Sequence, residues 1–273
     1  MATWFITGAS AGIGRAVTEQ LLRAGHRVAA TAGDASRLKD LSGNLWTADL
    51  DVTDTEAVRD VVSRAFGELG RIDVVFSNAG RGAVGAAEEL SDEAIAEQIA
   101  VNLTGPIQLV RAVLPHLRAQ GGGRIIQTTT MGAQISSPGA SLYHSSKWGI
   151  EGFLESLAPE VAPLGIGVTM VEPGSVRTGF GAALSIAEPM AAYAGTPAGQ
   201  VHRYVAASGG NLTGSAPGDP VKVAAAVIAS AAVDPAPRRL VLGSDAYQAV
   251  RAALDARLGE LDPALAASTD FAA

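Results

Sequence analysis

Residues Thr7-Gly8-Ala9-Ser10-Ala11-Gly12-Ile13-Gly14 contain three glycines and join a short apolar run, Trp4–Thr7, to an amphipathic stretch, Ile13–Ala24. This order predicts a strand, a tight turn and a helix in immediate succession. Glycines there let the backbone turn sharply and approach a pyrophosphate, to which the amides at the helix start donate hydrogen bonds. A tight strand-to-helix turn that binds no ligand is the alternative interpretation.

The same alternation of apolar runs and amphipathic stretches continues along the chain. The predicted strands are Trp4–Thr7, Val28–Thr31, Leu45–Ala48, Val74–Ser77, Arg124–Thr128, Val168–Glu172 and Arg239–Leu242. The predicted helices are Ile13–Ala24, Thr55–Leu69, Asp92–Gln120 with a break near Gly105-Pro106, Tyr143–Ala162, Pro220–Ala232 and Ala246–Leu258. Strands that alternate with helices require right-handed crossovers, so the pattern predicts an α/β fold of three layers with a doubly wound, mostly parallel sheet.

The chain of 273 residues is 48% hydrophobic and shows neither an internal repeat nor a dividing linker. We therefore expect a single domain over residues 1–273. Residues 178–219 differ in texture, because they are rich in Gly, Ala, Ser and Pro and have weak periodicity. Long insertions of this kind are lids, binding loops or mobile segments, and we expect a lid over a substrate site.

Charge and composition argue against several classes of partner. The net charge is −7 without a long basic run, which gives no support for a nucleic-acid or membrane surface. No cysteine is present, which excludes disulfides and thiolate metal sites. The four histidines are scattered singly, so no metal site is predicted. The N-terminus lacks the pattern of a signal peptide, and a cytoplasmic location is the default expectation.

Tyr143 and Lys147 stand four positions apart within a predicted helix. This spacing puts both side chains on one helix face, so an ammonium can lie close to a phenol. A nearby cation favours phenolate and lowers the pKa of tyrosine from its usual value of ~10, which suits proton transfer. Tyrosine and lysine also occur at this spacing by chance, so the interpretation depends on the other motifs.

Together these motifs resemble the short-chain dehydrogenase/reductase family in its simple, single-domain, Rossmann-like form, over the chain to about Val241. The glycine pattern is G-x-x-x-G-x-G, and Tyr143 with Lys147 forms the Y-x-x-x-K pair. Asn78-Ala79-Gly80 follows the fourth predicted strand, Asn102 lies in the next helix, and Pro173-Gly174 follows the sixth strand.

The resemblance implies an NAD(P) cofactor. Asp51-Val52 would meet the adenine, although Asp51 also suits a helix N-terminus, and Thr178 would contact the nicotinamide carboxamide. The implied cofactor-binding residues, besides Tyr143 and Lys147, are Gly8, Ser10, Gly12, Ile13, Gly14, Gly33, Asp51, Val52, Asn78, Ala79, Gly80, Pro173, Gly174, Val176 and Thr178.

The choice between NAD(H) and NADP(H) is made at the end of the second strand. NAD-preferring relatives carry an acid there for the ribose 2′-hydroxyl, and this chain has Ala32. Many NADP-preferring relatives carry an arginine at the next position, and this chain has Gly33. Loss of the acid removes the main objection to a 2′-phosphate, so NADP(H) is favoured over NAD(H). Bases that would lie near the phosphate, or be solvated surface, are Arg15, Arg37 and Lys39.

The family's substrate-binding serine precedes the tyrosine by about thirteen positions, where this chain has Thr130. Threonine keeps the hydroxyl, but its methyl group restricts the rotamers and crowds the site, so full and weakened activity are both open. The resemblance implies that Thr130 orients the substrate oxygen and Tyr143 transfers the proton. Lys147 would lower the tyrosine pKa and hold the nicotinamide ribose, while Asn102 supports Lys147 through a water or only marks a helix kink.

The implied function is interconversion of a ketone or aldehyde and an alcohol on a moderately large apolar substrate, a small molecule. One alternative is a nucleotide-binding regulatory protein without chemistry, which Thr130 and Gly33 favour. Another is an epimerase or dehydratase that uses the same cofactor. Helices that carry the equivalents of Asn102 and Tyr143 often pair between subunits in the family, so a homodimer or homotetramer is expected.

Overall fold

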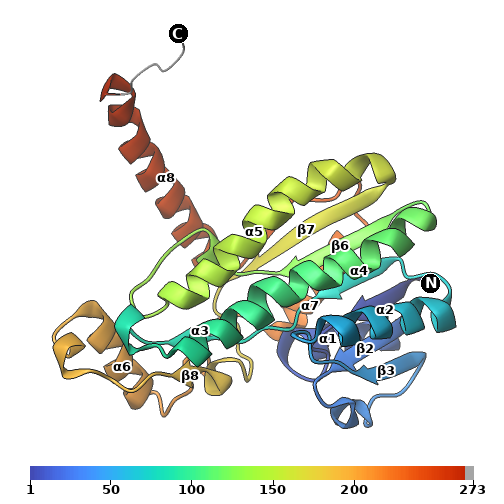
Figure 1. The fold of residues 1–273 in the computed structure, drawn as a ribbon, viewed down its shortest axis with the longest axis horizontal. Helices are drawn as coiled ribbons and strands as arrows, with labels where there is room; N and C mark the ends of the chain where they lie inside the picture. The colour runs from blue at the N-terminus through green and yellow to red at the C-terminus, as the bar shows by residue number, and fades with distance from the viewer. Residues whose placement is uncertain (268–273) are drawn as a thin grey trace.

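The structure is a computed structural model that describes the backbone of residues 1–267 and the side chains of residues 1–262. Its centre is a seven-stranded sheet of order β3-β2-β1-β4-β6-β7-β9, in which neighbouring strands are parallel (Figure 1). The strands are β1 (Thr3–Ile6), β2 (Arg27–Ala32), β3 (Leu45–Asp49), β4 (Val74–Ser77), β6 (Gly123–Thr128), β7 (Ile166–Pro173) and β9 (Arg239–Leu242). The predicted doubly wound α/β fold is confirmed, and the strand order reverses between β1 and β4.

Helices cover both faces of the sheet. The α-helices of the described residues are α1 (Gly12–Arg23), α2 (Thr55–Leu69), α3 (Asp92–Ile99), α4 (Gly105–Ala119), α5 (Ser141–Val161), α6 (Pro197–Ala207), α7 (Pro220–Ser230) and α8 (Ser244–Ala267), of which α6 and α8 lie outside the two layers. Successive residues of β1 enter different cores, because Phe5 joins the core under α2, α4 and α5, whereas Trp4 and Ile6 join the core under α1 and α7. This period of two makes strands covered on both faces almost wholly apolar.

The break predicted near Gly105-Pro106 is a wide, π-helical turn at Ala100–Thr104, through which α3 continues into α4. A Cβ atom at Gly105 would lie 2.7 Å from the carbonyl oxygen of Val52, so glycine permits the close approach of the two segments. Turns of this kind inside helices are frequent at functional sites, and this one carries Asn102.

The excursion at residues 178–219 contains two elements that its weak periodicity did not predict. Strand β8 (Ser185–Ile186) pairs in parallel with β5 (Ala83–Val84), and α6 begins after Thr196, whose side chain accepts from the amide of Gly199. The threonine cap followed by Pro197 is a helix-start signal that the sequence reading overlooked.

A buried carboxylate fastens this excursion to the rest of the domain. The side chain of Glu89 is fully buried and accepts hydrogen bonds from the amides of Ala86 at 2.6 Å and Met190 at 2.8 Å. It also pairs with His202 of α6, with Nε2 and Oε2 2.7 Å apart. These three contacts hold the pKa of Glu89 at about 2, well below its usual value.

Helix α8 is longer than predicted, because it continues past Leu258 to Ala267, and Figure 1 shows it projecting from the body of the domain. Among the described residues, none of the helices has the length and apolar character needed to cross a bilayer.

Candidate active site

The glycine turn between β1 and α1 has a conformation that only glycine adopts easily. Gly8 and Gly12 have φ values of 66° and 55°. A Cβ atom at Gly14 would lie 2.3 Å from the carbonyl oxygen of Gly8, and one at Gly8 would lie 2.9 Å from the Cα atom of Ala79. The turn is therefore tight on its protein side, where the two strand ends meet.

The start of α1 is open to an anion. Its N-cap, Ala11, provides no side-chain hydrogen bond, and the first turn contains no acid. The first amides of the helix thus lack the usual internal partners, and the positive end of the helix dipole points out of the turn. Gly12 and Ile13 are partly exposed there, and Ser10 lies beside them. The turn fits the pyrophosphate of a dinucleotide.

Asn78, at the end of β4, connects the turn to the neighbouring strands. Its Nδ2 donates to the carbonyl oxygen of Gly8 at 3.2 Å, and its backbone amide donates to Oγ1 of Thr7 at 3.0 Å. Its Oδ1 accepts from Oγ1 of Thr128 at 3.1 Å. Asn78 therefore braces three strand ends at the edge where doubly wound proteins bind ligands.

Tyr143 and Lys147 lie on one face of α5, above the end of β6. The Nζ atom of Lys147 lies 5.9 Å from the centre of the Tyr143 ring and donates to the carbonyl oxygen of Thr128 at 3.1 Å. Lys147 is buried and Tyr143 partly exposed. The ring of Phe180, from the excursion, lies 6.0 Å from the Tyr143 ring between centroids. The predicted pair and the predicted lid therefore meet in space.

The predicted effect of Lys147 on Tyr143 is wrong for this structure. Burial raises the pKa of Tyr143 to about 12, and a hydrogen bond with the Thr130 side chain offsets only part of that rise. Burial also lowers the pKa of Lys147 to about 8, although the nearby charge of Glu151 raises it in part. Lys147 points its ammonium at a backbone carbonyl, so desolvation outweighs attraction to a phenolate and Tyr143 is a neutral phenol.

Thr130 begins the loop after β6 and faces Tyr143. Its Oγ1 accepts from the amide of Gly132 at 3.2 Å and lies 3.5 Å from the carbonyl oxygen of Pro173. Thr130, thirteen positions before Tyr143, therefore has its hydroxyl beside the phenol, where the family's serine was expected.

Asn102 is completely buried beneath the same site. Its amide group accepts from the backbone amide of Arg81 at 2.9 Å and donates to that residue's carbonyl oxygen at 2.8 Å. A Cβ atom at Gly80 would lie 3.4 Å from Oδ1 of Asn102 and 3.7 Å from Nζ of Lys147. The two side chains are thus neighbours across Gly80, and support of Lys147 through a water stays a prediction.

Residues after β7 close the site from the other side. The amide of Gly174 donates to Leu242 in β9, and the amide of Ser175 donates to Oδ2 of Asp245 at 2.8 Å. Val176 is buried and bridges to Gly218. A Cβ atom at Gly12 would lie 3.5 Å from the side chain of Thr178, so the start of the excursion lies on the glycine turn.

The residues predicted for the adenosine end lie farther along the same edge. Val52 lines a narrow cavity together with Thr7 and Ala79. Asp51 is exposed, and its carboxylate accepts from the amide and hydroxyl of Thr53. Gly33 is exposed at the end of β2, and a Cβ atom there would meet nothing within 4 Å.

Arg15, one of the bases predicted near a 2′-phosphate, is occupied by other partners. Its Nε lies 2.6 Å from Glu19, and its NH2 lies 2.5 Å from Oδ2 of Asp40. Two acids therefore neutralise this arginine, which leaves Arg37 and Lys39 as the remaining bases of that prediction.

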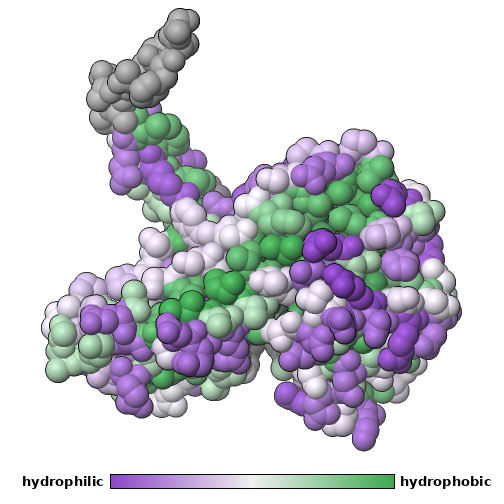
Figure 2. Space-filling view, viewed as in Figure 1, coloured by the Kyte–Doolittle hydropathy of each residue, from purple (hydrophilic) through white to green (hydrophobic). Residues whose placement is uncertain are grey.

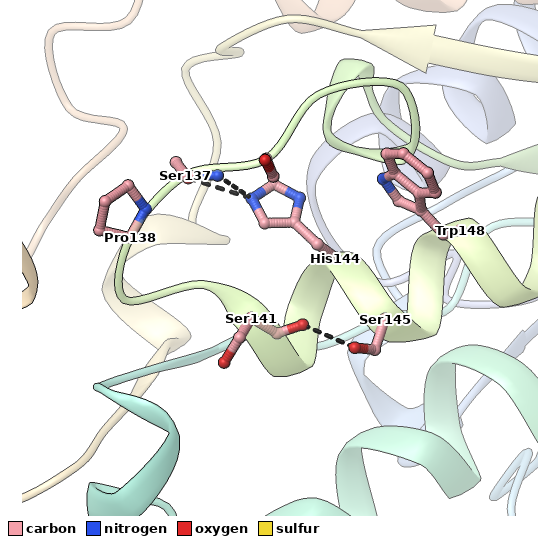
Figure 3. A pocket seen from close by; sticks show the side chains of 7 residues that line it. Ser137, Pro138, Ser141, His144, Ser145 and Trp148 are labelled. Carbon is pink, nitrogen blue, oxygen red and sulfur yellow. Dashed lines mark hydrogen bonds between the residues drawn. The ribbon is translucent and has the colours of Figure 1, made fainter. Parts of the chain in front are cut away.

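An open cavity of about 580 Å³ lies on the opposite face of α5 and is separate from the predicted site (Figure 3). Its lining residues on α5 follow helical spacing, and Tyr143 is not one of them. The whole lining consists of Ser136, Ser137 and Pro138 from the preceding loop and Ser141, His144, Ser145 and Trp148 from α5. The ring of His144 lies 2.6 Å from the carbonyl oxygen of Gly132 and 3.0 Å from Oγ of Ser137, so it fastens this loop to α5.

A buried charged cluster below the site escaped the sequence analysis. Arg239 of β9 forms ion pairs with Glu172 of β7 and with Glu151 of α5, one turn after Lys147. Glu172 is completely buried, and its burial, together with the charge of Glu151, raises its pKa to about 7. The sequence did contain one signal for this cluster, because Glu172 ends the apolar run Val168–Glu172. A charged residue at the end of a buried strand predicts a partner of opposite charge, since buried charges are almost always paired.

Replacing Glu172 with glutamine is expected to remove a pH dependence of stability. The folded-state pKa of about 7 exceeds the reference value of 4.5, so wild-type protein binds this proton more tightly when folded. The stabilisation is fully present below pH 4.5 and is lost as the pH rises through 7, on the order of 2 kcal/mol. Urea unfolding between pH 5 and 8 should show the free energy of unfolding of the variant falling less than that of wild type. Equal slopes would exclude Glu172 as the titrating group.

Comparisons with known proteins agree with this geometry. The family profile described as short chain dehydrogenase matches residues 2–188. The chain is 36% identical to the oxidoreductase BOA17 of Botryotinia fuckeliana over 254 residues, which cover 90% of each protein. A short-chain dehydrogenase structure from Streptomyces avermitilis superposes with a TM-score of 0.89 at 37% identity, over 98% of both chains.

A second solved relative is the alcohol dehydrogenase of Thermococcus sibiricus, complexed with 5-hydroxy-NADP. It is 28% identical, has a TM-score of 0.71, and the match covers 89% of this chain and 96% of that one. The family profile spans more than half of the sequence, and the Botryotinia fuckeliana relative aligns over nine tenths of it. Both matches indicate the same family. This chain belongs to the short-chain dehydrogenase family.

Proposed function

We propose that this protein is an NAD(P)H-dependent reductase that converts a ketone or aldehyde into an alcohol, with Tyr143 as the general acid. The observation that carries the proposal is the geometry around Tyr143, whose phenol hydrogen-bonds with the Thr130 side chain while Nζ of Lys147 lies 5.9 Å from its ring centre. All three lie at the sheet edge that also carries the open N-terminus of α1. A proton donor, an oxygen-binding hydroxyl and a cofactor cradle thus converge.

Each side chain has one task in this mechanism. Thr130 donates its hydroxyl hydrogen to the substrate carbonyl oxygen and holds that oxygen against the phenol. Tyr143 gives its proton to the same oxygen as negative charge develops there. Lys147, whose ammonium is held by the carbonyl oxygen of Thr128, binds the ribose, and Asn102 supports it from beneath. A bound nicotinamide would supply the hydride, so the protein contributes alignment and charge placement.

The protonation state of Tyr143 suits its proposed role as the proton donor in reduction. Reduction needs a phenol that can donate, and a pKa of about 12 keeps Tyr143 protonated over the whole physiological range. Oxidation of an alcohol would need the phenolate at the start. Ionisation of Tyr143 in this site would have to overcome the desolvation that raises its pKa.

The cofactor we assign is NADP(H) in preference to NAD(H). The glycine turn fits a pyrophosphate, and the Thermococcus sibiricus relative is described as complexed with 5-hydroxy-NADP. Ala32 puts no carboxylate at the ribose end, and Arg37 and Lys39 are exposed nearby on the segment after β2. Dissociation constants for NADPH and NADH test this assignment, and a hundredfold preference for NADH would contradict it.

Replacing Gly33 with arginine is expected to tighten NADPH binding about tenfold and leave NADH binding nearly unchanged. Space for the new side chain exists, because a Cβ atom at Gly33 meets nothing within 4 Å. Fluorescence titration of both nucleotides measures the effect, and Gly33→Gln is the matched neutral control. A gain of equal size for NADH would show that the arginine does not meet a 2′-phosphate.

Replacing Thr130 with valine is expected to reduce turnover about a hundredfold, because the shape is kept and one donor to the substrate oxygen is lost. Thr130→Ser should keep or raise turnover, since it removes only the crowding methyl group. Thr129→Val is the control, because the Val171 oxygen that its hydroxyl contacts also accepts from the Thr129 amide. Normal turnover of Thr130→Val would remove Thr130 from the mechanism.

Residues 178–219 are proposed to form a lid over a moderately large apolar substrate. Phe180 lies beside the Tyr143 ring, and Leu184 and Phe180 would both meet a Cβ atom at Gly82, so apolar side chains of the excursion reach the site. We also propose that the protein forms a homodimer or homotetramer, which is the oligomeric state that the family resemblance implies.

The decisive experiment measures oxidation of NADPH and NADH by the purified protein against a panel of aliphatic, aromatic and polycyclic ketones and aldehydes. Turnover of the larger apolar members supports the proposed reductase. Nucleotide binding without turnover of any member, with Thr130→Ser equally inactive, would instead identify a nucleotide-binding regulatory protein. Isomerised or dehydrated product without net cofactor oxidation would identify an epimerase or dehydratase.

A further inference from the structure

Helix α8 leaves the body of the domain after its first half. Its backbone runs from Ser244 to Ala267, a length of ~36 Å at the helical rise. Ala246 and Val250 are buried against the body, whereas the described side chains from Leu254 onward are exposed, apart from the half-buried Arg257. Figure 1 shows the far half projecting from the body, and Arg257 is the residue of this half that contacts another element, at Trp148 of α5. A short helix without packing is only marginally stable in water, so this half calls for a partner.

The exposed half carries an apolar stripe with the spacing of a coiled coil. Tyr247, Leu254, Leu258 and Leu261 are 63%, 42%, 56% and 63% exposed. With Arg251 they are separated by four, three, four and three residues, which is the alternation of the two core positions of a heptad. Figure 2 shows apolar residues along one side of α8, next to charged ones. Scattered exposed leucines need no explanation, but three that share one heptad stripe do.

We propose that α8 is a self-association arm, which pairs in parallel with α8 of a second copy of this chain through Leu254, Leu258 and Leu261. The inference is independent of the proposed reductase activity. It concerns the leucine face of α8, which is a different surface from the faces of α4 and α5 whose pairing between subunits the family resemblance implies.

The charged residues beside the apolar stripe favour a second copy of α8 as the partner and a parallel orientation of the two helices. Arg257 and Asp262 flank the leucines on opposite sides, at positions that face each other between two parallel helices. Neither forms an ion pair within the described side chains. A parallel pair places Arg257 of each copy beside Asp262 of the other. In an antiparallel pair, Asp255 and Asp262 of one copy would face the same two acids of the other copy, and Arg257 would face Arg257. Both arrangements bring like charges together and are repulsive.

The direction in which the arm leaves the body is also set by the structure. The Arg257 guanidinium lies 4.8 Å from the centre of the Trp148 ring on α5, and Arg251 pairs with Asp255 along the helix at 2.9 Å. An arm held at a fixed angle loses less conformational freedom when it binds, which makes a short apolar seam more effective.

Single-cysteine cross-linking tests the arrangement directly, because the natural chain contains no cysteine. Leu261→Cys of the full-length protein under mild oxidation should form a disulfide-linked dimer on a non-reducing gel. In a parallel pair this residue meets its own copy, whereas in an antiparallel pair it would meet the other core position. Ala256→Cys, on the outward side of α8, should stay at least tenfold less cross-linked. Equal cross-linking of the two variants, or none, overturns the proposal.

Solution mass and charge reversal provide the second test. Light scattering over a dilution series should show Leu258→Glu with a smaller assembly than wild type, while circular dichroism reports an intact fold. Arg257→Asp and Asp262→Arg should each weaken self-association about tenfold, and the double variant should restore it. Failure of the double variant to recover would contradict the parallel pairing. An unchanged mass for Leu258→Glu would show that the arm does not bind a second copy.

Discussion

Tyr143→Phe is expected to reduce turnover about a thousandfold while nucleotide binding is retained. The change removes one hydroxyl, the proposed proton donor, and general acid catalysis contributes about 10²–10⁴ in rate. Packing should persist, because the ring still meets Phe180 at the observed centroid distance of 6.0 Å. Steady-state rates of NADPH oxidation with an active ketone, and the dissociation constant for NADPH, are the two measurements.

Tyr247→Phe is the matched control, because Tyr247 is 63% exposed on α8 and lies outside both the proposed mechanism and the proposed lid. It should show wild-type turnover. The pH profile provides a further check, since a donor with a pKa of about 12 gives no loss of reduction between pH 6 and 9 from its own titration. Turnover of Tyr143→Phe within a few-fold of wild type would eliminate Tyr143 as the acid.

Arg239→Leu is expected to lower the free energy of unfolding by about 3 kcal/mol, the largest loss of stability among the proposed variants. Removing the guanidinium leaves Glu151 and Glu172 buried without their shared counter-charge. Glu172, whose pKa is already raised by burial, would escape the penalty by taking up a proton. The loss should therefore be larger at pH 8 than at pH 5, and urea unfolding at the two pH values measures it.

Arg238→Leu is the matched control, because Arg238 is 43% exposed and pairs only with the exposed Glu155. Surface pairs contribute about 0–1 kcal/mol, so this variant should unfold close to wild type. A double variant of Arg239→Leu and Glu172→Gln should recover part of the lost stability. Equal losses for Arg238→Leu and Arg239→Leu would mean that the buried cluster does not hold α5, β7 and β9 together.

The elements that the sequence predicted well are those that follow from short-range physics. Strand β4 was predicted with its observed bounds, Val74–Ser77, because a wholly apolar run between turn residues has few other solutions. The break at Gly105 was predicted because proline at the next position lacks an amide hydrogen. The end of α8 was placed nine residues early, since amphipathic periodicity does not show where a projecting helix stops.

Other features depended on residues far apart in the sequence. The cluster of Glu151, Glu172 and Arg239 joins two strands and a helix, and no local pattern connects these three positions. Helix α6 is fastened to the rest of the domain by its His202, which meets the buried Glu89, and these two residues lie far apart in the sequence. The pKa of Tyr143 was mispredicted for the same reason. A spacing of four residues predicts that Lys147 is a neighbour of Tyr143, but it does not predict how far the rest of the fold removes the phenol from water.

By itself, the sequence determined the order of the seven strands of the main sheet and of the helices between them, the glycine turn, and the helical face that Tyr143 shares with Lys147. These follow from periodicity, backbone freedom and spacing, which act over a few residues. Only the tertiary structure decided that burial raises the pKa of Tyr143 beside Thr130, that Arg239 balances two buried acids, and that α8 projects from the body. Desolvation and charge pairing depend on which distant segments come together, and that is settled only when the whole chain has folded.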